Sequence, residues 1–234
     1  MFEHLEMAPA DAILGLTEAF KNDKNPKKIN LGVGVYKDAD GKTPLLESVR
    51  LAEAWVVANE DTKSYLPITG DPQYGVLTRQ LLFGPENAID QKSRACTAQT
   101  PGGTGALRVA GDFIKRCFGN AAVWVSDPTW ANHPAIFDAA GVEVKTYPYY
   151  DAETQSVAFD AMMAALKEAP KGDVVLLHAC CHNPSGVDLD ARQWQALALL
   201  MKERELLPLI DFAYQGFGDG LDEDAAGLRS IAKT

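Results

Sequence analysis

Side chains that could do chemistry gather in four short segments, each following an apolar run. They are residues 101–105 (Pro-Gly-Gly-Thr-Gly), 127–130 (Asp-Pro-Thr-Trp), 178–186 (His-Ala-Cys-Cys-His-Asn-Pro-Ser-Gly) and 211–214 (Asp-Phe-Ala-Tyr). Together they offer unpaired backbone amides, an indole, imidazoles, a carboxamide, a carboxylate and a phenol. One ligand with an anionic tail and a planar cationic ring would use most of these groups.

The glycine turn at residues 101–105 opens a predicted helix, whose first N–H groups lack partners and would suit a phosphate. It is not a dinucleotide-binding fingerprint, since Arg108 stands where a glycine is needed, and no Gly-Lys-Ser/Thr follows as in a P-loop. A nucleotide-dependent enzyme is therefore disfavoured. A glycine-rich connection without a ligand is the alternative.

Asp211 closes an otherwise apolar strand pattern. A carboxylate there is costly unless it meets a cation or several donors, so we expect a positive group to face it. Capping a following helix is the alternative, but the next residues do not form a strong helix pattern.

Residues 178–182 contain two histidines and two cysteines. Zinc prefers such ligands, but structural sites usually draw ligand pairs from separated segments, and no second pair occurs. We therefore expect no metal. The amide of Asn183 would either cap the turn at residues 183–186 or contact a ligand.

Trp130 could stack on a planar ring or fill the core beneath its loop. His133, taken alone, would be a structural histidine with its hydrogen bonds satisfied.

These segments need elements to position them, and the apolar periodicity supplies an alternation of strands and helices. Strands are expected at 96–100, 121–126, 142–147, 174–178 and 206–212, and helices at 104–118, 131–140, 159–169, 189–204 and 225–232. Strands separated by helices pair in parallel through right-handed crossovers, which predicts an α/β fold with a mostly parallel sheet between helices. Ligands bind at the carboxyl ends of such strands.

The first part of the chain is organised differently. A helix is expected at 12–21 with Asp11 as its cap, followed by an extended run at 29–36. Thr43-Pro44 and Asp71-Pro72 each predict a helix start. The acidic residues Asp219, Asp222, Glu223 and Asp224 are expected to lie in solvent.

Composition narrows the function classes. The chain has 234 residues, 47% of them hydrophobic, and a net charge of -10, which disfavours nucleic acid as a partner. No apolar run approaches the ~18 residues of a membrane span, the first residues do not form a secretion signal, and four scattered cysteines do not form a disulfide scaffold. We expect a soluble cytoplasmic protein without a membrane partner.

Three of these motifs, in this order and at these spacings, resemble the fold type I pyridoxal phosphate aminotransferases. They are residues 100–105, Asn183-Pro184-Ser185-Gly186 and residues 211–217. The resemblance is strongest to the class I aspartate and aromatic amino acid aminotransferases and covers the whole chain. It implies a pyridoxal phosphate-binding large domain at 45–234, incomplete at its C-terminus, preceded by an N-terminal arm and small-domain segment at 1–44.

The resemblance also implies roles for individual residues. Gly103 and Thr104 would bind the cofactor phosphate, Trp130 would cover the pyridine face, and Asp211 would pair with the protonated ring nitrogen. Asn183 and Tyr214 would hydrogen-bond the cofactor's phenolate oxygen, and His133 would orient the aspartate. Of these, Asp211, Tyr214 and Trp130 are the catalytic candidates.

The same resemblance implies substrate and subunit contacts. Gly34, Trp130 and Asn183 would hold the substrate α-carboxylate, and Tyr65 would reach the phosphate bound by the second subunit of a homodimer. The substrates would be an L-amino acid, aspartate or aromatic, and a 2-oxo acid.

One family feature is missing. The lysine that binds the cofactor as a Schiff base lies farther from the aspartate than this chain extends, and Lys233 comes too early and is expected at the surface. We therefore expect a partial sequence that is inactive alone. A non-catalytic cofactor-binding or assembly module that lost the lysine is the alternative.

Overall fold

The computed structural model describes residues 12–29, 34–85, 89 and 94–234. The chain divides into two compact units, Met1–Asp61 and Thr62–Thr234. This division falls after Asp61, whereas the sequence placed a domain boundary after residue 44, and that functional boundary stays a prediction.

The first unit contains two helices, α1 (Ala12–Asn22) and α2 (Glu47–Asn59). None of the residues of α2 is buried within the chain. The expected helix start at Thr43-Pro44 is wrong, because the backbone stays extended through Leu46 and α2 begins without a side-chain cap. Asp11 and residues 30–33 of the expected extended run lie outside the described residues.

The second unit is an alternation of helices and strands, as the sequence predicted. Its elements are α3 (Pro72–Phe83), α5 (Gly102–Cys117), β1 (Val123–Asp127), α6 (Asn132–Ala139), β2 (Val144–Pro148), β3 (Tyr150–Asp151), β4 (Ser156–Val157), α7 (Phe159–Lys167), β5 (Val174–His178), α8 (Ala191–Arg204), β6 (Leu207–Asp211) and α9 (Ala226–Lys233).

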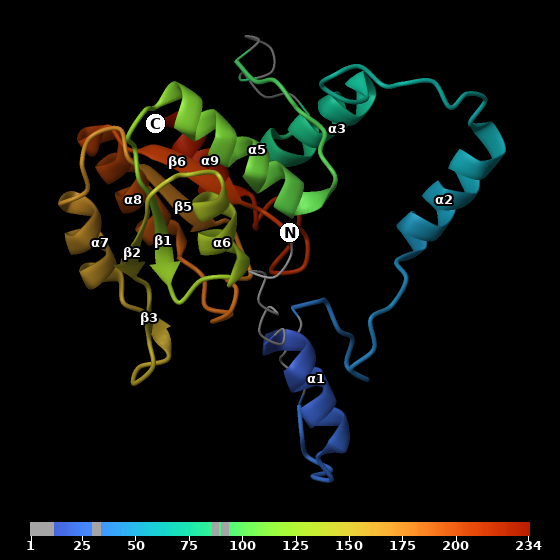
Figure 1. The fold of residues 1–234 in the computed structure, drawn as a ribbon, viewed down its shortest axis with the longest axis horizontal. Coiled ribbons are helices and arrows are strands. Elements are labelled where there is room, and N and C mark those ends of the chain that lie inside the picture. The colour runs from blue at the N-terminus through green and yellow to red at the C-terminus, as the bar shows by residue number, and fades with distance from the viewer. Residues whose placement is uncertain (1–11, 30–33, 86–88, 90–93) are drawn as a thin grey trace, which may run out of the picture. The chain divides into compact units, whose positions relative to one another are not determined.

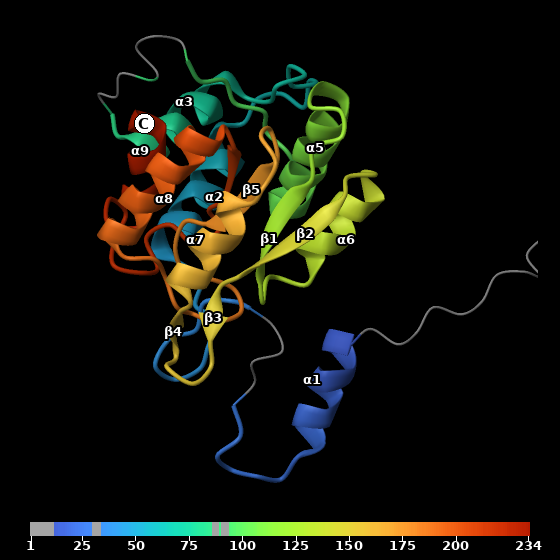
Figure 2. The same ribbon diagram turned by 90° about the vertical axis from the view of Figure 1, so that its left-hand side faces the viewer.

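Four of the strands form a parallel sheet in the order β2-β1-β5-β6, and β3 and β4 form a separate antiparallel pair. Helices cover both faces, with α5 and α6 on one and α7 and α8 on the other (Figures 1 and 2). The predicted α/β fold with a parallel sheet between helices is confirmed. Because the strands are parallel, their carboxyl ends share one edge, and the register pairs His178 with Asp211 there.

The central strand β5 explains why both faces need covering. Val174 and Leu176 enter the core formed with α5 and α6, whereas Val175 and Leu177 enter the core formed with α7 and α8. Successive strand residues point to opposite faces, so a strand buried on both sides is apolar throughout.

Two of the predicted helix starts have good caps. Asp71 accepts a hydrogen bond from the Tyr74 N–H (2.8 Å) at the start of α3. Asp190 and Gln193 form a capping box at the start of α8.

The expected strand at 96–100 does not form. Its polar groups contact α3 and the residues before it: Gln99 N–H donates to Thr69 O (2.9 Å), and Arg79 Nη1 lies 3.1 Å from Thr97 Oγ1. The local sequence pattern predicted an extended segment. It could not show that this segment would hydrogen-bond to α3 and the residues before it instead of joining the sheet.

The expected solvent position of Asp224 is also wrong. Its carboxylate is buried and accepts hydrogen bonds from the N–H groups of Gly216 (2.8 Å), Gly218 (3.1 Å) and Asp219 (2.8 Å). Burial by itself would raise the pKa of Asp224, but these backbone donors lower it overall. Asp224 therefore fixes the loop that follows β6.

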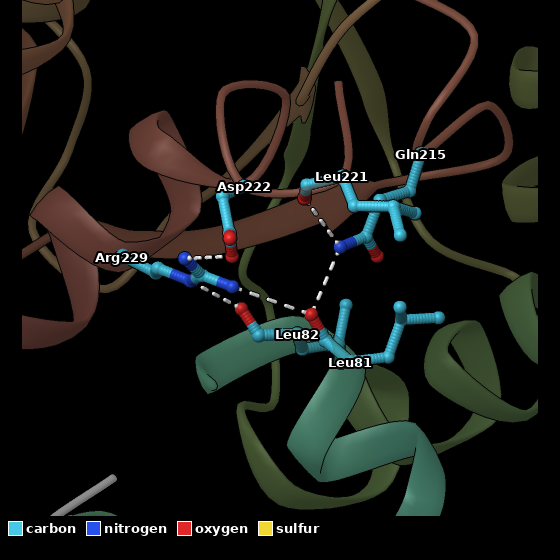
Figure 3. Close-up of polar contacts among 6 residues, drawn as sticks. All are labelled: Leu81, Leu82, Gln215, Leu221, Asp222 and Arg229. Carbon is cyan, nitrogen blue, oxygen red and sulfur yellow. Dashed lines mark hydrogen bonds and ion pairs between the residues drawn. The ribbon is translucent and has the colours of Figure 1, made fainter. Parts of the chain in front are cut away.

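The C-terminal end of α3 is held by residues from the far end of the chain (Figure 3). Arg229 of α9 donates from Nε to Leu82 O (2.8 Å) and from Nη1 to Asp222 (2.8 Å), and Gln215 donates to Leu81 O (2.9 Å). These contacts satisfy carbonyls that a helix end leaves without partners.

Among the described residues, no helix is long and apolar enough to cross a membrane.

Candidate active site

The carboxyl edge of the sheet brings Asp211 and His133 together. Asp211 ends β6, and His133 lies in the first turn of α6, where His133 Nε2 is 2.9 Å from Asp211 Oδ2. On the other side of the ring, Nδ1 is 2.7 Å from Thr129 Oγ1. His133 is fully buried. Thr129 holds the His133 ring, and the ring in turn fixes the position of the Asp211 carboxylate. Within this chain the Asp211 carboxylate thus contacts a histidine, and the expected positive group stays a prediction.

This pairing keeps Asp211 negatively charged. Burial alone would raise the pKa of the carboxyl, but the hydrogen bond from His133, together with electrostatic interactions with the neighbouring imidazoles, lowers it overall. An ionised carboxylate at the end of a buried strand is a strong site for a cationic group of a ligand.

Two further histidines extend the cluster. The rings of His133 and His178 are 5.2 Å apart and those of His178 and His182 are 4.4 Å apart, measured between centroids. Burial and the neighbouring imidazoles lower the pKa of His178 to about 4 and that of His182 to about 3, so both are neutral at pH 7.

The surroundings of these two histidines differ. His182 is hydrogen-bonded at both ring nitrogens, to Ser126 Oγ (2.9 Å) and Ser185 Oγ (2.7 Å), and stacks on Tyr149. By contrast, neither ring nitrogen of His178 has a partner among the residues that the structure describes, although both are buried. Such an orphaned polar group indicates a position where a ligand or water completes the structure.

Trp130 lies beside this cluster. Its ring is half-buried and meets the His133 ring edge to face, with centroids 5.3 Å apart. Trp130 also packs against the core formed with α5 and α6. The sequence left open whether Trp130 lies at the site or in the core. Its ring contacts both.

The glycine turn lies at the amino end of α5, which starts at Gly102 without a side-chain cap. Helix α5 runs antiparallel to β1, so its amino end is on the side of the sheet where the strands end (Figures 1 and 2). A Cβ added at Gly102 or Gly103 would meet nothing within 4 Å, and Thr104 is exposed. Gly102 N–H donates to Thr100 O (2.9 Å), so the open part of the first turn of this sixteen-residue helix lies around Gly103.

The remaining candidate residues differ in how far they are buried. Asn183 and Tyr214 are half-buried in the loops after β5 and β6. Tyr65 belongs to the second unit and is fully exposed (104% of its reference area). Gly34 belongs to the first unit and is exposed.

Three side chains at the carboxyl edge of the sheet are close enough to be considered as metal ligands. Candidate ligand atoms of His133, His178 and Asp211 lie within 4.8 Å of one another. Only His178 comes from the segment that suggested zinc, and His133 and Asp211 already contact each other at 2.9 Å, closer than two ligands sit around a zinc ion with bonds of ~2.0–2.2 Å. The absence of a metal remains a prediction.

Lys233 is the last residue of α9, and its side chain is exposed. Ser230 stands three residues before it, but both belong to one helix that packs on α8. The expected surface position of Lys233 is confirmed.

A parallel sheet between helices, with an ionised carboxylate and an amide-rich helix start at its carboxyl edge, defines a cofactor-binding α/β protein. The family described as "Aminotransferase class I and II" matches residues 26–233, and the chain belongs to this family. The resemblance inferred from the three motifs is confirmed.

Individual relatives of the chain are named aminotransferases. The chain is 56% identical to aspartate aminotransferase of Escherichia coli over 232 residues and 51% identical to aromatic-amino-acid aminotransferase of Pseudomonas aeruginosa over 231. An aromatic-amino-acid aminotransferase from Burkholderia pseudomallei, solved covalently bound to pyridoxal phosphate, superposes with a TM-score of 0.94 at 49% identity over the whole chain. The chain spans 99–100% of its own length in these matches but only 58–59% of the relatives.

Sequence reasoning missed the parts played by Thr129, His178 and His182. The available signal was a polar strand end, since His178 closes the buried run Val174–His178 as Asp211 closes Leu207–Asp211. Only the register of β5 and β6 shows that these two strand ends are neighbours.

Proposed function

We propose that this chain carries the cofactor-binding part of an aminotransferase that uses pyridoxal 5'-phosphate. The reaction would move an amino group from an L-amino acid, aspartate or aromatic, to a 2-oxo acid. Family membership and the names of the relatives support this proposal. The ionised Asp211, held by His133 at the carboxyl edge of the sheet, is the observation that carries it.

The residues present fit the cofactor. A pyridinium nitrogen needs an anion, which Asp211 offers. A phosphate needs amide donors such as the N–H groups that begin a helix, and the start of α5 has open space for one around Gly103. The unpartnered ring nitrogens of His178, beside Asp211 in the sheet, fit a site that is completed by a ligand. When bound, pyridoxal phosphate supplies a ring that withdraws electrons from the substrate's α-carbon.

Asp211 would keep the ring nitrogen protonated, because a carboxylate with a lowered pKa favours a cation beside it. His133 would hold this carboxylate in place, and Thr129 would hold His133. A neutral residue at position 211 would remove the charge that stabilises the protonated ring.

The remaining residues would bind and orient. Gly103 and Thr104 would donate to the phosphate, Trp130 would cover one face of the ring, and Asn183 and Tyr214 would hydrogen-bond its phenolate oxygen. Gly34, Trp130 and Asn183 would hold the substrate α-carboxylate. These assignments follow the family pattern, and the half-buried positions of Trp130, Asn183 and Tyr214 at the ends of β1, β5 and β6 support them.

The assembly would be a homodimer in which Tyr65 reaches the phosphate held by the second subunit. The full exposure of Tyr65 within one chain supports this role, because its hydroxyl is accessible to another chain. We propose a cytoplasmic location, supported by a relative from rice that is named a cytoplasmic aspartate aminotransferase.

Cofactor binding is tested by titrating the 234-residue chain with pyridoxal phosphate and following absorbance. We expect a saturable change with one cofactor per chain, and much weaker binding of pyridoxal, which lacks the phosphate. Equal responses to both compounds would contradict a phosphate site at α5.

Catalysis needs a second test, because we expect the chain alone to lack turnover. Reading the gene beyond codon 234 separates the hypotheses. An open frame leading to a Ser-x-x-Lys segment, with transaminase activity of its product, supports the enzyme. A stop codon at that point favours a non-catalytic module.

A further inference from the structure

Two cysteines follow β5 directly and form a pair. Cys180 and Cys181 are adjacent in the turn after β5 and influence each other's pKa, and all four cysteines of the chain are free thiols. Cys96 and Cys117 are exposed and lie in other parts of the sequence. The pair at 180–181 is therefore chemically distinct from the other two thiols.

The backbone leaves strand geometry at this pair. In a strand, neighbouring side chains point to opposite faces. After β5 ends at His178, Cys181 adopts a left-handed conformation with φ +50, which leaves the extended geometry. The Asp188 carboxylate accepts hydrogen bonds from the N–H groups of Cys181 (2.7 Å) and His182 (2.8 Å) and holds this turn. The turn that carries both thiols is thus held in one backbone conformation.

The surroundings keep both sulfurs protonated. Burial, followed by the neighbouring Cys181 and the carboxylates of Asp224 and Asp188, raises the pKa of Cys180. Burial also raises the pKa of Cys181, and Asp188, Asp224 and Asp219 add to this, while the neighbouring Cys180 opposes it. Reagents that need a single thiolate should therefore react slowly with this pair.

We propose that Cys180 and Cys181 form a vicinal dithiol site that binds a trivalent arsenical through both sulfurs. Cys181 is half-buried and offers the entry point, and Cys180 is buried directly beside it. With phenylarsine oxide, two As–S bonds form, the arsenic–oxygen bond breaks, and the two thiol protons leave with that oxygen as water. Arsenic remains trivalent, so no oxidant or reductant is needed.

The test is to treat the 234-residue chain with phenylarsine oxide and measure its mass. We expect one phenylarsine group per chain, retained in excess 2-mercaptoethanol and removed by dithiothreitol, because only a dithiol competes with a two-sulfur site. Tryptic mapping should place the adduct on residues 172–192, since Cys96 and Cys117 fall in other tryptic peptides. Removal by 2-mercaptoethanol, or an adduct on another peptide, would overturn the proposal.

Variants provide the matched comparison. Cys180→Ser and Cys181→Ser should each abolish the monothiol-resistant adduct, whereas the double variant Cys96→Ser/Cys117→Ser should keep it. Iodoacetamide should show the opposite preference and label Cys96 and Cys117 first. Retention of the resistant adduct in Cys181→Ser would refute the two-sulfur site, and the mapping on the unmodified sequence tests it without relying on any variant.

Discussion

His133 Nε2 and Asp211 Oδ2 lie 2.9 Å apart although 78 residues separate them in the sequence. The contact joins the first turn of α6 to the last residue of β6 and places an oriented, ionised carboxylate at the carboxyl edge of the sheet. Most of the proposed cofactor chemistry depends on this pair.

Replacing Asp211 with Asn should weaken binding of pyridoxal phosphate by about 10- to 100-fold. A hydrogen bond to a charged group contributes about 1.5–3 kcal/mol, and the amide cannot hold a proton on the ring nitrogen. Titration by absorbance measures the effect. Asp138→Asn, an exposed carboxylate on α6, is the control and should bind normally. Unchanged affinity in Asp211→Asn would remove the basis for the proposed function.

The chain should lose stability as the pH falls from about 6.5 to 4. His178 and His182 have pKa values of about 4 and 3 when folded, below the ordinary 6.5, so the unfolded chain binds more protons in this range. The contribution is fully present above pH 6.5. Because one pKa unit corresponds to about 1.4 kcal/mol, the loss should reach several kcal/mol.

Denaturant unfolding at several pH values measures this slope. The lowered pKa values of Asp211 and Asp224 act in the same direction at still lower pH. His178→Leu should flatten the slope between pH 6.5 and 4, because it removes one of the two buried imidazoles. An identical slope in that variant would show that His178 does not titrate as described.

Arg229→Ala should destabilise the second unit by about 1–3 kcal/mol, because the Leu82 carbonyl and the end of α3 lose a charged donor. Hydrogen exchange should increase most in α3. Arg192→Ala, which changes an exposed arginine on α8, should have little effect. Equal protection of α3 in both variants would contradict the role of Arg229 shown in Figure 3.

Gly227→Ala should destabilise the chain by about 1–3 kcal/mol through overpacking. A Cβ at this position would lie 2.3 Å from the Trp194 ring, where α9 crosses α8. Gly103→Ala is the matched comparison, because a Cβ there meets nothing within 4 Å and the site is helical. Thermal unfolding of both variants should separate them by several degrees, and similar midpoints would contradict the close α8–α9 contact.

Much of the fold could be predicted from residues that are close in sequence. The apolar run Val174–His178, the cap at Asp71 and the glycines at the start of α5 act through local geometry, and the helices and strands predicted from residue 104 onward formed within a few residues of their expected places. The segment 96–100 did not join the sheet and instead hydrogen-bonds to Thr69 and Arg79, and α2 begins at Glu47, three residues after the expected first position, Pro44.

The sequence by itself determined the alternation of strands and helices and the identity of the polar residues at the strand ends, because periodicity and motif spacing are local properties. Only the tertiary structure decided that β5 lies between β1 and β6, that His178 is the neighbour of Asp211, and that Asp224 is buried. Strand order and side-chain encounters depend on packing between segments far apart in the chain, and no local pattern encodes that packing.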